Sequence, residues 1–184
     1  MLGAVIGDIA GSRFEFDNYR HTDFDIFSPD SDFTDDTICT VAIADWVLQG
    51  CNDNLASILQ GWCRAYPCPK GAYGGRFSQW IEWKDPEPYN SWGNGSAMRV
   101  SAVGWAFATL EETLHFAKQS AIVTHNHPEG IKGAQAVAAA IFWARTGIGK
   151  AQIKENITRQ FGYDLSQSCD QIRPHYHFNE SCQE

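Results

Sequence analysis

The sequence predicts an all-α protein that consists of one domain. Helical patterns recur along most of the 184 residues, and no segment shows a convincing run of alternating strand residues. A chain of this length fits one domain, since domains most often have about 100–150 residues. A composition with 43% hydrophobic residues, seven Trp and eleven Phe is sufficient to build a core. We therefore expect residues 1–184 to form one helical domain.

The first expected helix, residues 2–13, is short and rich in small side chains. The second, residues 37–49, has apolar side chains on almost every face, which is typical of a buried helix. Further helices are expected at about residues 54–65, 96–108, 111–121, 130–146 and 151–160. Loops rich in Gly, Pro, Asn and Asp are expected at residues 17–36, 67–75, 84–95 and 124–129. After Phe161 the chain becomes polar and shows no helical period.

Charge and composition narrow the class of protein. The formal net charge is -8 and no run is rich in Lys or Arg, which argues against a protein that binds nucleic acid or an anionic membrane. No stretch approaches the roughly 20 apolar residues of a membrane span, and the start lacks the features of a signal peptide. We expect a cytoplasmic protein whose six cysteines, without any Cys-x-x-Cys pair, are reduced thiols.

The strongest local motif is Phe33-Thr34-Asp35-Asp36-Thr37, where an acidic loop enters the helix expected from residue 37. Two adjacent carboxylates and a hydroxyl supply the hard oxygen donors that Mg²⁺, Mn²⁺ or Ca²⁺ prefers. The same residue types are favoured as a helix cap, because side-chain oxygens accept from the first amides and carboxylates suit the positive end of the helix dipole. From the motif alone, both interpretations stay open.

The second motif is Gly3-x-x-x-Gly7-Asp8-x-x-Gly11-x-x-x-Glu15. Glycines at helical spacing allow another backbone to approach closely, and this packing role by itself explains the pattern. In the alternative, functional interpretation, the helix presents Glu15 just beyond its end. Asp8 is expected to bond neighbouring backbone or to order a loop.

The third motif is Trp92-Gly93-Asn94-Gly95-Ser96-Ala97-Met98-Arg99, a flexible turn that leads directly into a helix. Unpaired amides at such a helix start can bind phosphate, and glycines let a ligand reach the backbone. No Gly-Lys-Ser/Thr follows, so the motif is not a Walker loop. An ordinary turn with a serine cap explains the spacing equally well.

The fourth motif is Thr124-His125-Asn126-His127-Pro128-Glu129, between two expected helices. Substrate contact or loop bonding by the two imidazoles is favoured over zinc binding, because no third ligand lies nearby. Four residues of the tail have zinc-like chemistry but irregular spacing: Cys169, His175, His177 and Cys182. Covalent hydrolase schemes have little support, because the chain has no Gly-x-Ser-x-Gly elbow.

Together and in this order, the four motifs resemble those of the ADP-ribosylglycohydrolase family. The resemblance implies an orthogonal multi-helix bundle that hydrolyses the glycosidic bond between ADP-ribose and an acceptor with two magnesium ions, manganese being the alternative metal. It also implies that Thr34, Asp35 and Asp36 are metal ligands. Glu15 would be catalytic and lie beside the metal centre. The residues implied to contact ADP-ribose are Gly93, Asn94, Gly95, Ser96, Met98 and His125.

The sequence departs from the family at its carboxyl end. Members carry a second motif, Gly-Asp-x-Asp-Thr, on a late helix, and this chain reaches Glu184 before it. We therefore expect a bundle that lacks its last helices, an incomplete second metal site and impaired hydrolysis by the isolated chain. The alternative is a catalytically inactive module that binds ADP-ribose or has a regulatory role. Apolar surface left uncovered on the helices at 37–49 and 130–146 is expected to favour homo-oligomers.

Overall fold

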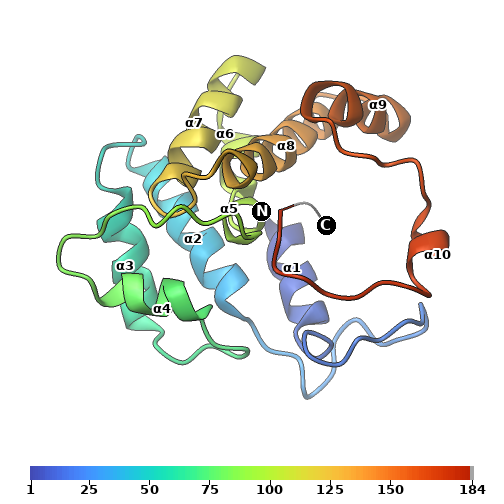
Figure 1. Cartoon of the computed structure of the whole chain (residues 1–184), viewed down its shortest axis with the longest axis horizontal. Coiled ribbons are helices and arrows are strands. Elements are labelled where there is room, and N and C mark those ends of the chain that lie inside the picture. Colours follow the sequence, from blue (N-terminus) through green and yellow to red (C-terminus); the bar gives the residue numbers. More distant parts are fainter. Residues whose placement is uncertain (183–184) are drawn as a thin grey trace.

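The computed structural model of the chain describes residues 1–182, which fold into packed helices (Figure 1). The helices are α1 (Leu2–Gly11), α2 (Asp35–Leu48), α3 (Leu55–Ala65), α4 (Gly75–Glu82), α5 (Gly95–Met98), α6 (Ser101–Ala106), α7 (Leu110–Ile122), α8 (Pro128–Arg145), α9 (Lys150–Phe161) and α10 (Cys169–Ile172). Within the described residues, strand-like pairing is limited to two isolated bridges, Thr34 with Lys70 and Gly93 with Ser181. The predicted all-α class is confirmed.

Helix α2 forms the centre of the core, as its nearly uniform apolar pattern predicts. Seven of its fourteen residues are buried, and it packs against α1, α3 and α6. Helix α8 is rich in alanine and glycine, so that α5, α6 and α7 can all approach it closely. A Cβ added to Gly104 of α6 would lie 2.6 Å from Cβ of Ile141 in α8, which shows how tight this contact is.

Three expectations about the helices need correction. The helix expected at 96–108 is two short helices, α5 and α6, separated at Arg99 and Val100, and this break accompanies the burial of the Arg99 side chain. Helix α4 was not predicted, because its Gly-Gly start resembles a loop. Its side chains at 77, 80 and 81 nevertheless have helical spacing and enter the core. The polar tail also contains a helical turn, α10, which a capping box at Ser168 stabilises.

Exposed apolar side chains lie on the two expected helices and also on others, such as α6, where Trp105 is 54% exposed. Residues of α2 are mostly buried, with Leu48 at its end as the strongly exposed exception, and α8 exposes Val137. Helix α1 instead has no buried residue, and the side chains of Leu2 and Ile6 are 79% and 46% exposed. The prediction that the helices at 37–49 and 130–146 promote homo-oligomers stays a prediction.

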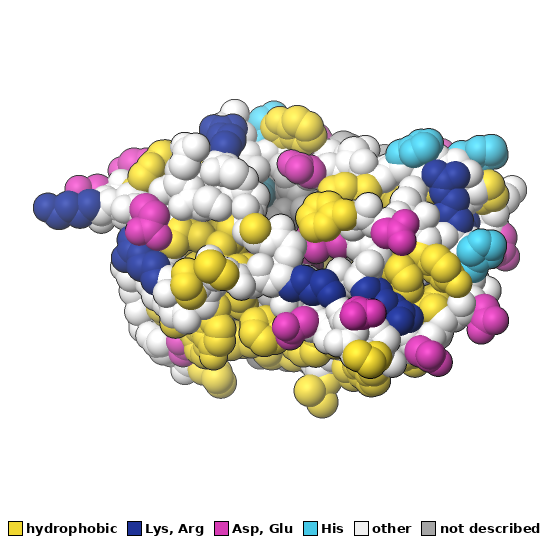
Figure 2. Space-filling model, turned by 90° about the horizontal axis from the view of Figure 1, so that it is seen from below, with side chains coloured by type: hydrophobic (Ala, Val, Ile, Leu, Met, Phe, Trp, Pro, Cys, Tyr) yellow, Lys and Arg dark blue, Asp and Glu magenta, His cyan; other side chains and the backbone are white. Residues whose placement is uncertain are grey.

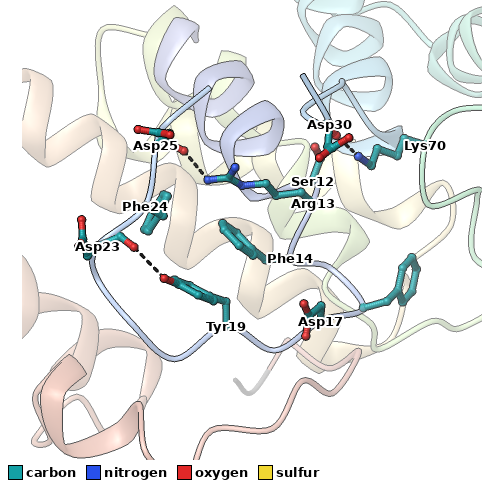
Figure 3. Close-up of a pocket in the computed structure, with 11 residues that line it drawn as sticks. Ser12, Arg13, Phe14, Asp17, Tyr19, Asp23, Phe24, Asp25, Asp30 and Lys70 are labelled. Carbon is teal, nitrogen blue, oxygen red and sulfur yellow. Dashed lines mark hydrogen bonds between the residues drawn. The ribbon is translucent and has the colours of Figure 1, made fainter. Parts of the chain in front are cut away.

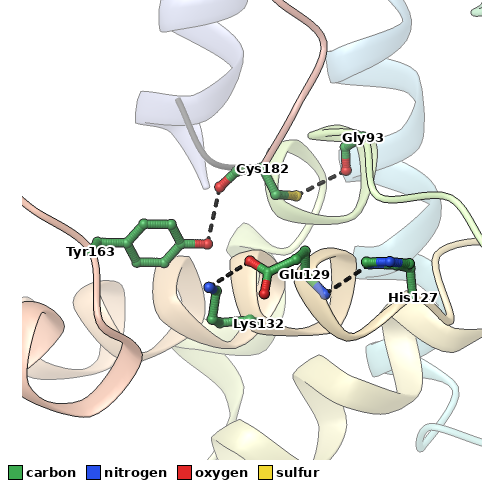
Figure 4. Close-up of polar contacts among 6 residues, drawn as sticks. All are labelled: Gly93, His127, Glu129, Lys132, Tyr163 and Cys182. Carbon is green, nitrogen blue, oxygen red and sulfur yellow. Dashed lines mark hydrogen bonds and ion pairs between the residues drawn. The ribbon is translucent and has the colours of Figure 1, made fainter.

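The tail after α9 crosses back over the front of the molecule to the loop that precedes α5 (Figure 1). Figure 4 shows its attachment: the Tyr163 hydroxyl donates to the Cys182 carbonyl at 3.0 Å, and the Cys182 thiol donates to the Gly93 carbonyl at 2.8 Å. His175 and Cys169 are exposed whereas Cys182 is buried, so the zinc-like residues of the tail do not converge.

The charged side chains on the surface are mixed in sign, and the expectation that nucleic acid is not a ligand stays a prediction. On the face in Figure 2, Lys and Arg side chains are scattered among acidic and hydrophobic ones and form no continuous basic area. None of the helices within residues 1–182 has the length and apolar character that crossing a bilayer requires.

Candidate active site

One cavity of about 830 Å³ gathers almost all of the residues that the motifs predict as functional. Its walls come from the end of α1, the start of α2, the start of α4, the loop before α5 and the turn before α8. The predicted residues that line it are Glu15, Thr34, Asp35, Asp36, Gly93, Asn94, Gly95, Met98 and His125. Segments far apart in the sequence thus contribute to a single site.

Ser96 is the predicted site residue that does not line the cavity. Its side chain is fully buried, and its hydroxyl donates to the Gly130 carbonyl of α8 at 2.7 Å. The hydroxyl therefore fastens α5 to α8. A contact of Ser96 with a ligand stays a prediction, and it would have to use the backbone amide.

The acidic end of the cavity is organised by Asp8. One oxygen of its carboxylate accepts from the Thr34 amide at 2.9 Å, the Thr37 amide at 3.2 Å and the Thr37 hydroxyl at 2.5 Å. The other oxygen accepts from the Thr34 hydroxyl at 2.6 Å. Asp8 thus fixes the start of α2 from a different helix. Of the two roles expected for Asp8, bonding to neighbouring backbone or ordering a loop, these contacts agree with the second, and the sequence did not indicate that the partners are Thr34 and Thr37.

Thr34 is the N-cap of α2, because its hydroxyl oxygen accepts from the Asp36 amide at 3.2 Å. The capping interpretation of this motif is therefore confirmed for Thr34. It does not compete with the metal interpretation, since the cap holds Asp35 and Asp36 in the first turn of α2, where their side chains line the cavity.

Four carboxylates crowd this end: Asp8, Glu15, Asp35 and Asp36. The Lys70 charge partly offsets the repulsion at Glu15. Burial, followed by repulsion from Asp36, raises the pKa of Asp35 to about 7. Burial, followed by repulsion from Asp8, raises the pKa of Asp36 to about 6. The pKa of Glu15 is also raised, mainly by burial and then by Asp8. Each anion is therefore destabilised by its neighbours, a condition that a divalent cation would relieve.

Glu15 provides a further sign of an unsatisfied polar site. Its Oε2 is buried and has no hydrogen-bond partner within the described residues. Gly71, which has a φ of +81°, lies against this carboxylate, and a Cβ at position 71 would overlap it. The chain therefore uses a glycine to make room for a carboxylate that accepts no hydrogen bond from protein.

The donor chemistry at this end fits a hard divalent ion such as Mg²⁺, because Thr34, Asp35 and Asp36 offer oxygen atoms and Glu15 has a free one. Within residues 1–182, no three His, Cys, Asp or Glu side chains converge into a ready metal site. The ligand roles of these residues accordingly stay predictions.

The opposite end of the cavity is formed by the Gly93–Gly95 turn and His125. A Cβ on Gly95 would lie 3.0 Å from Nε2 of His125, so the imidazole lies against the glycine backbone. Burial, followed by the Arg99 charge, lowers the pKa of His125 to about 3. The ring is therefore neutral at physiological pH.

The hydrogen bonds around His125 also indicate which ring nitrogen carries the proton. Arg99 donates to the Thr124 hydroxyl oxygen at 2.8 Å, and that hydroxyl lies 2.7 Å from Nδ1 of His125. Because the hydroxyl oxygen already accepts from Arg99, its hydrogen is free to be donated to Nδ1. We assign the proton to Nε2 on this basis; in that tautomer Nε2 can donate to a ligand. His127 by contrast caps α8, since its Nδ1 accepts from the Glu129 amide at 3.1 Å (Figure 4).

Sequence reasoning missed the wall that α4 contributes. Gly74, Gly75 and Arg76 line the cavity, and so does Tyr89, whose ring centroid lies 6.2 Å from that of His125. The helical spacing of residues 77, 80 and 81 is the signal that could have identified α4. No local pattern indicates that Arg76 and Tyr89 meet.

A second cavity, of about 740 Å³, lies within the loop after α1 (Figure 3). It contains none of the predicted site residues. Polar side chains bridge its walls: Arg13 donates to the Asp25 carbonyl and the Tyr19 hydroxyl to the Asp23 carbonyl. Ser12 and Phe16 line both cavities, so this loop borders the candidate site.

Comparison with known proteins agrees with this architecture. Residues 1–176 match the sequence model of the family described as ADP-ribosylglycohydrolase. The chain is 26% identical to ADP-ribosylhydrolase ARH3 of Xenopus tropicalis over 175 residues, which cover 80% of this chain and 49% of that protein. It is 36% identical to ADP-ribosylhydrolase ARH3 of Mus musculus over 62 residues, 34% of this chain and 17% of that protein.

The chain thus spans about half the length, or less, of the curated relatives it matches. The match to the family model nevertheless covers nearly all of the described residues and all four motifs, on a fold made of helices. The chain belongs to the ADP-ribosylglycohydrolase family.

Proposed function

We propose that the chain takes part in hydrolysing the glycosidic bond between ADP-ribose and an acceptor, with Mg²⁺ as the cofactor and Mn²⁺ as a substitute. The main support is the single cavity that has crowded carboxylates at one end and a glycine turn with a neutral histidine at the other. Such a cavity can hold the reacting sugar beside the carboxylates and the rest of the nucleotide along the turn.

In this proposal Thr34, Asp35 and Asp36 hold the metal, and Asp8 orients Thr34 through the Thr34 hydroxyl. When bound, Mg²⁺ would stabilise negative charge and lower the pKa of a coordinated water. Glu15 accepts a hydrogen bond from the attacking water with the Oε2 atom that has no protein partner, and so orients it toward the anomeric carbon. Anionic carboxylates also stabilise the oxocarbenium-like charge that develops on the sugar.

At the other end, Gly93, Asn94, Gly95 and Met98 form the wall along which the nucleotide lies, and Ser96 contributes its amide. The glycines allow close packing of this wall: a Cβ on Gly93 would lie 3.1 Å from the Glu180 carbonyl oxygen, and a Cβ on Gly95 would lie 3.0 Å from Nε2 of His125. His125 donates from Nε2 to a ligand oxygen or nitrogen, and its low pKa keeps it from adding a charge.

The glycine turn also favours a second candidate function, an ADP-ribose-binding module without hydrolysis. The binding end of the cavity is assembled from rigid, neighbouring elements, whereas the described residues provide one pair of adjacent aspartates for metal. Binding of ADP-ribose without release of the acceptor would favour this second function.

The experiment compares hydrolysis of peptides ADP-ribosylated on arginine and on serine, with Mg²⁺ and with EDTA. The variants are Asp35→Asn and Asp36→Asn, and the control is Asp53→Asn, an exposed aspartate of the α2–α3 loop. Because hydrolysis by the isolated chain is expected to be impaired, we expect slow Mg²⁺-dependent release of ADP-ribose, which both site variants abolish and the control retains. Calorimetry of Mg²⁺ binding accompanies the assay, because metal affinity that is unchanged in both variants would refute the ligand assignment.

A further inference from the structure

The candidate cavity is lined by charges of both signs. Asp8, Glu15, Asp35 and Asp36 form its acidic end, and Arg76, Arg99 and one further acidic residue, Glu180, line the rest of it. Arg76 lies beside Tyr89, with its Cζ 4.9 Å from the ring centroid, and we call this part of the cavity the arginine side. The charges of Arg76 and Arg99 both lower the pKa of Tyr89 against the larger, opposite effect of burial. The acidic end repels an anionic ligand, and the arginine side attracts one.

The two arginines differ in how accessible their guanidinium groups are to a ligand. Arg99 is 1% exposed, and one of its terminal nitrogens donates to the Ser120 carbonyl at 3.0 Å and to the Thr124 hydroxyl. Arg76 is exposed, at the start of α4. In the part of the chain that the structure describes, the ion pairs join other residues, and neither arginine has a carboxylate partner.

The Arg76 guanidinium is held in place although it is exposed. Its Nη2 donates to the Tyr89 carbonyl at 2.6 Å, and its Cζ lies 4.9 Å from the centroid of the Tyr89 ring. One of five guanidinium N–H groups is thus used, and the remaining donors are free for a ligand. Stacking on the ring restricts the side chain, so binding loses less conformational entropy than it would for a mobile arginine.

The position of Arg76 relates it to the glycine turn. Residues 89–95 run from its Tyr89 partner to Gly95, and Tyr89, Ser91, Gly93 and Gly95 all line the cavity. His125 lies between the two ends of this segment, with its ring near Tyr89 and its Nε2 against Gly95. A ligand that follows this wall therefore has the Arg76 donors along its course.

We propose that Arg76 binds phosphate oxygens of the nucleotide and makes the cavity select phosphorylated ribosides over neutral nucleosides. This inference rests on the proposed function and adds a specificity-determining residue to it. Attraction at Arg76 and repulsion at the carboxylates act in the same direction, so the pyrophosphate is drawn to the arginine side and the ligand is oriented. A fixed guanidinium also suits the paired oxygens of a phosphate group.

The alternative explanation is that Arg76 has a structural role only, through its hydrogen bond to the Tyr89 carbonyl. Arg64 provides a matched control, because it is also an exposed arginine that donates through Nη2 to a backbone carbonyl, that of Ile81 in α4. Arg64 does not line the cavity. If only the hydrogen bond to a backbone carbonyl matters, Arg64→Gln and Arg76→Gln should change ligand affinity similarly. If Arg76 contacts phosphate, only Arg76→Gln should weaken the binding of phosphorylated ligands.

The experiment is calorimetric titration of the full chain with ADP-ribose, adenosine and inorganic pyrophosphate, in EDTA so that no metal bridges the phosphates. We expect Arg76→Gln to weaken ADP-ribose and pyrophosphate binding about tenfold, without changing the affinity for adenosine. Arg76→Lys should recover part of the loss, and Arg64→Gln should match the wild type. Thermal unfolding verifies that each variant is folded.

Several outcomes would overturn the inference: equal affinity of wild type and Arg76→Gln for both phosphorylated ligands, an equal loss for adenosine, or no binding of either phosphorylated ligand to the wild type. Arg76-dependent binding of pyrophosphate without any binding of ADP-ribose would support the phosphate site and count against the proposed function. The two proposals can therefore fail separately.

Discussion

Replacement of Asp8 by alanine tests whether this half-buried carboxylate assembles the acidic end of the cavity. Asp8 accepts four hydrogen bonds from Thr34 and Thr37, at 2.9, 2.6, 3.2 and 2.5 Å. A hydrogen bond to a charged group contributes about 1.5–3 kcal/mol, and a carboxylate at a helix N-terminus adds about 0.3–1 kcal/mol. These contributions are not additive when the bonds share one acceptor group.

Two effects make the expected loss of stability smaller than the sum of these contributions. Water can reach the vacated donors because Asp8 is only half-buried, and the variant removes the repulsion that raises the pKa values of Asp35, Asp36 and Glu15. We therefore expect Asp8→Ala to lower the free energy of unfolding by about 2–4 kcal/mol. For a protein of this length, that corresponds to a decrease in Tm of about 4–16 °C.

The same variant should weaken Mg²⁺ binding about 10–100-fold, because residues that orient a metal ligand typically contribute that much. The assays are urea denaturation and calorimetric Mg²⁺ titration, with the exposed residue in Asp53→Ala as the control. A free energy of unfolding within about 0.5 kcal/mol of the wild-type value, together with unchanged Mg²⁺ affinity, would refute the reasoning. Substitutions of exposed residues commonly have effects of that size.

Three further predictions concern the two ends of the cavity. Gly71→Ala should displace Glu15 and reduce hydrolysis of ADP-ribosylated peptides more than the control Gly147→Ala does. Both glycines have a positive φ (+81° and +90°), but only Gly71 adjoins a carboxylate. Equal activity of the two variants would contradict this prediction. Gly95→Val should prevent ADP-ribose binding in calorimetry, because its side chain would overlap His125 and fill the turn, and wild-type affinity would exclude the loop assignment. As the pH falls from about 6.5 to 3, the wild type should lose stability relative to His125→Gln. In this range His125 of the unfolded chain binds a proton, whereas His125 of the folded chain, with a pKa of about 3, does not. Parallel curves of unfolding free energy against pH for the two proteins would show that His125 does not contribute.

The local patterns predicted most helices because those helices satisfy their own periodicity. Helix α2 is apolar on nearly every face and becomes the centre of the core, and the capping and acidic residues at its start occur where the motif predicts them. Helix α4 was missed because its Gly-Gly start has a low helix propensity. What makes it helical is the burial of Phe77, Trp80 and Ile81 against the rest of the molecule, which is a tertiary effect.

Side-chain directions within a motif were also beyond local reasoning. Gly95 and Ser96 are adjacent, yet the first lines the cavity and the second fastens α5 to α8. Asp8 was expected to bond neighbouring backbone or to order a loop, but nothing local indicated that its partners lie 26 and 29 positions later in the chain. Such contacts depend on how two helices dock, which neither helix specifies alone.

The sequence by itself determined the helical class, the chemistry of four motifs and, through their order, the family. These properties depend on residue type and on spacing along one segment, which the backbone geometry of a helix or turn translates directly into local structure. The tertiary structure alone decided that the carboxylates share one end of a cavity, that His125 is neutral, and that Arg76 stands beside Tyr89. Those properties depend on distance through space and on burial, because charges and hydrogen bonds act between groups that packing brings together.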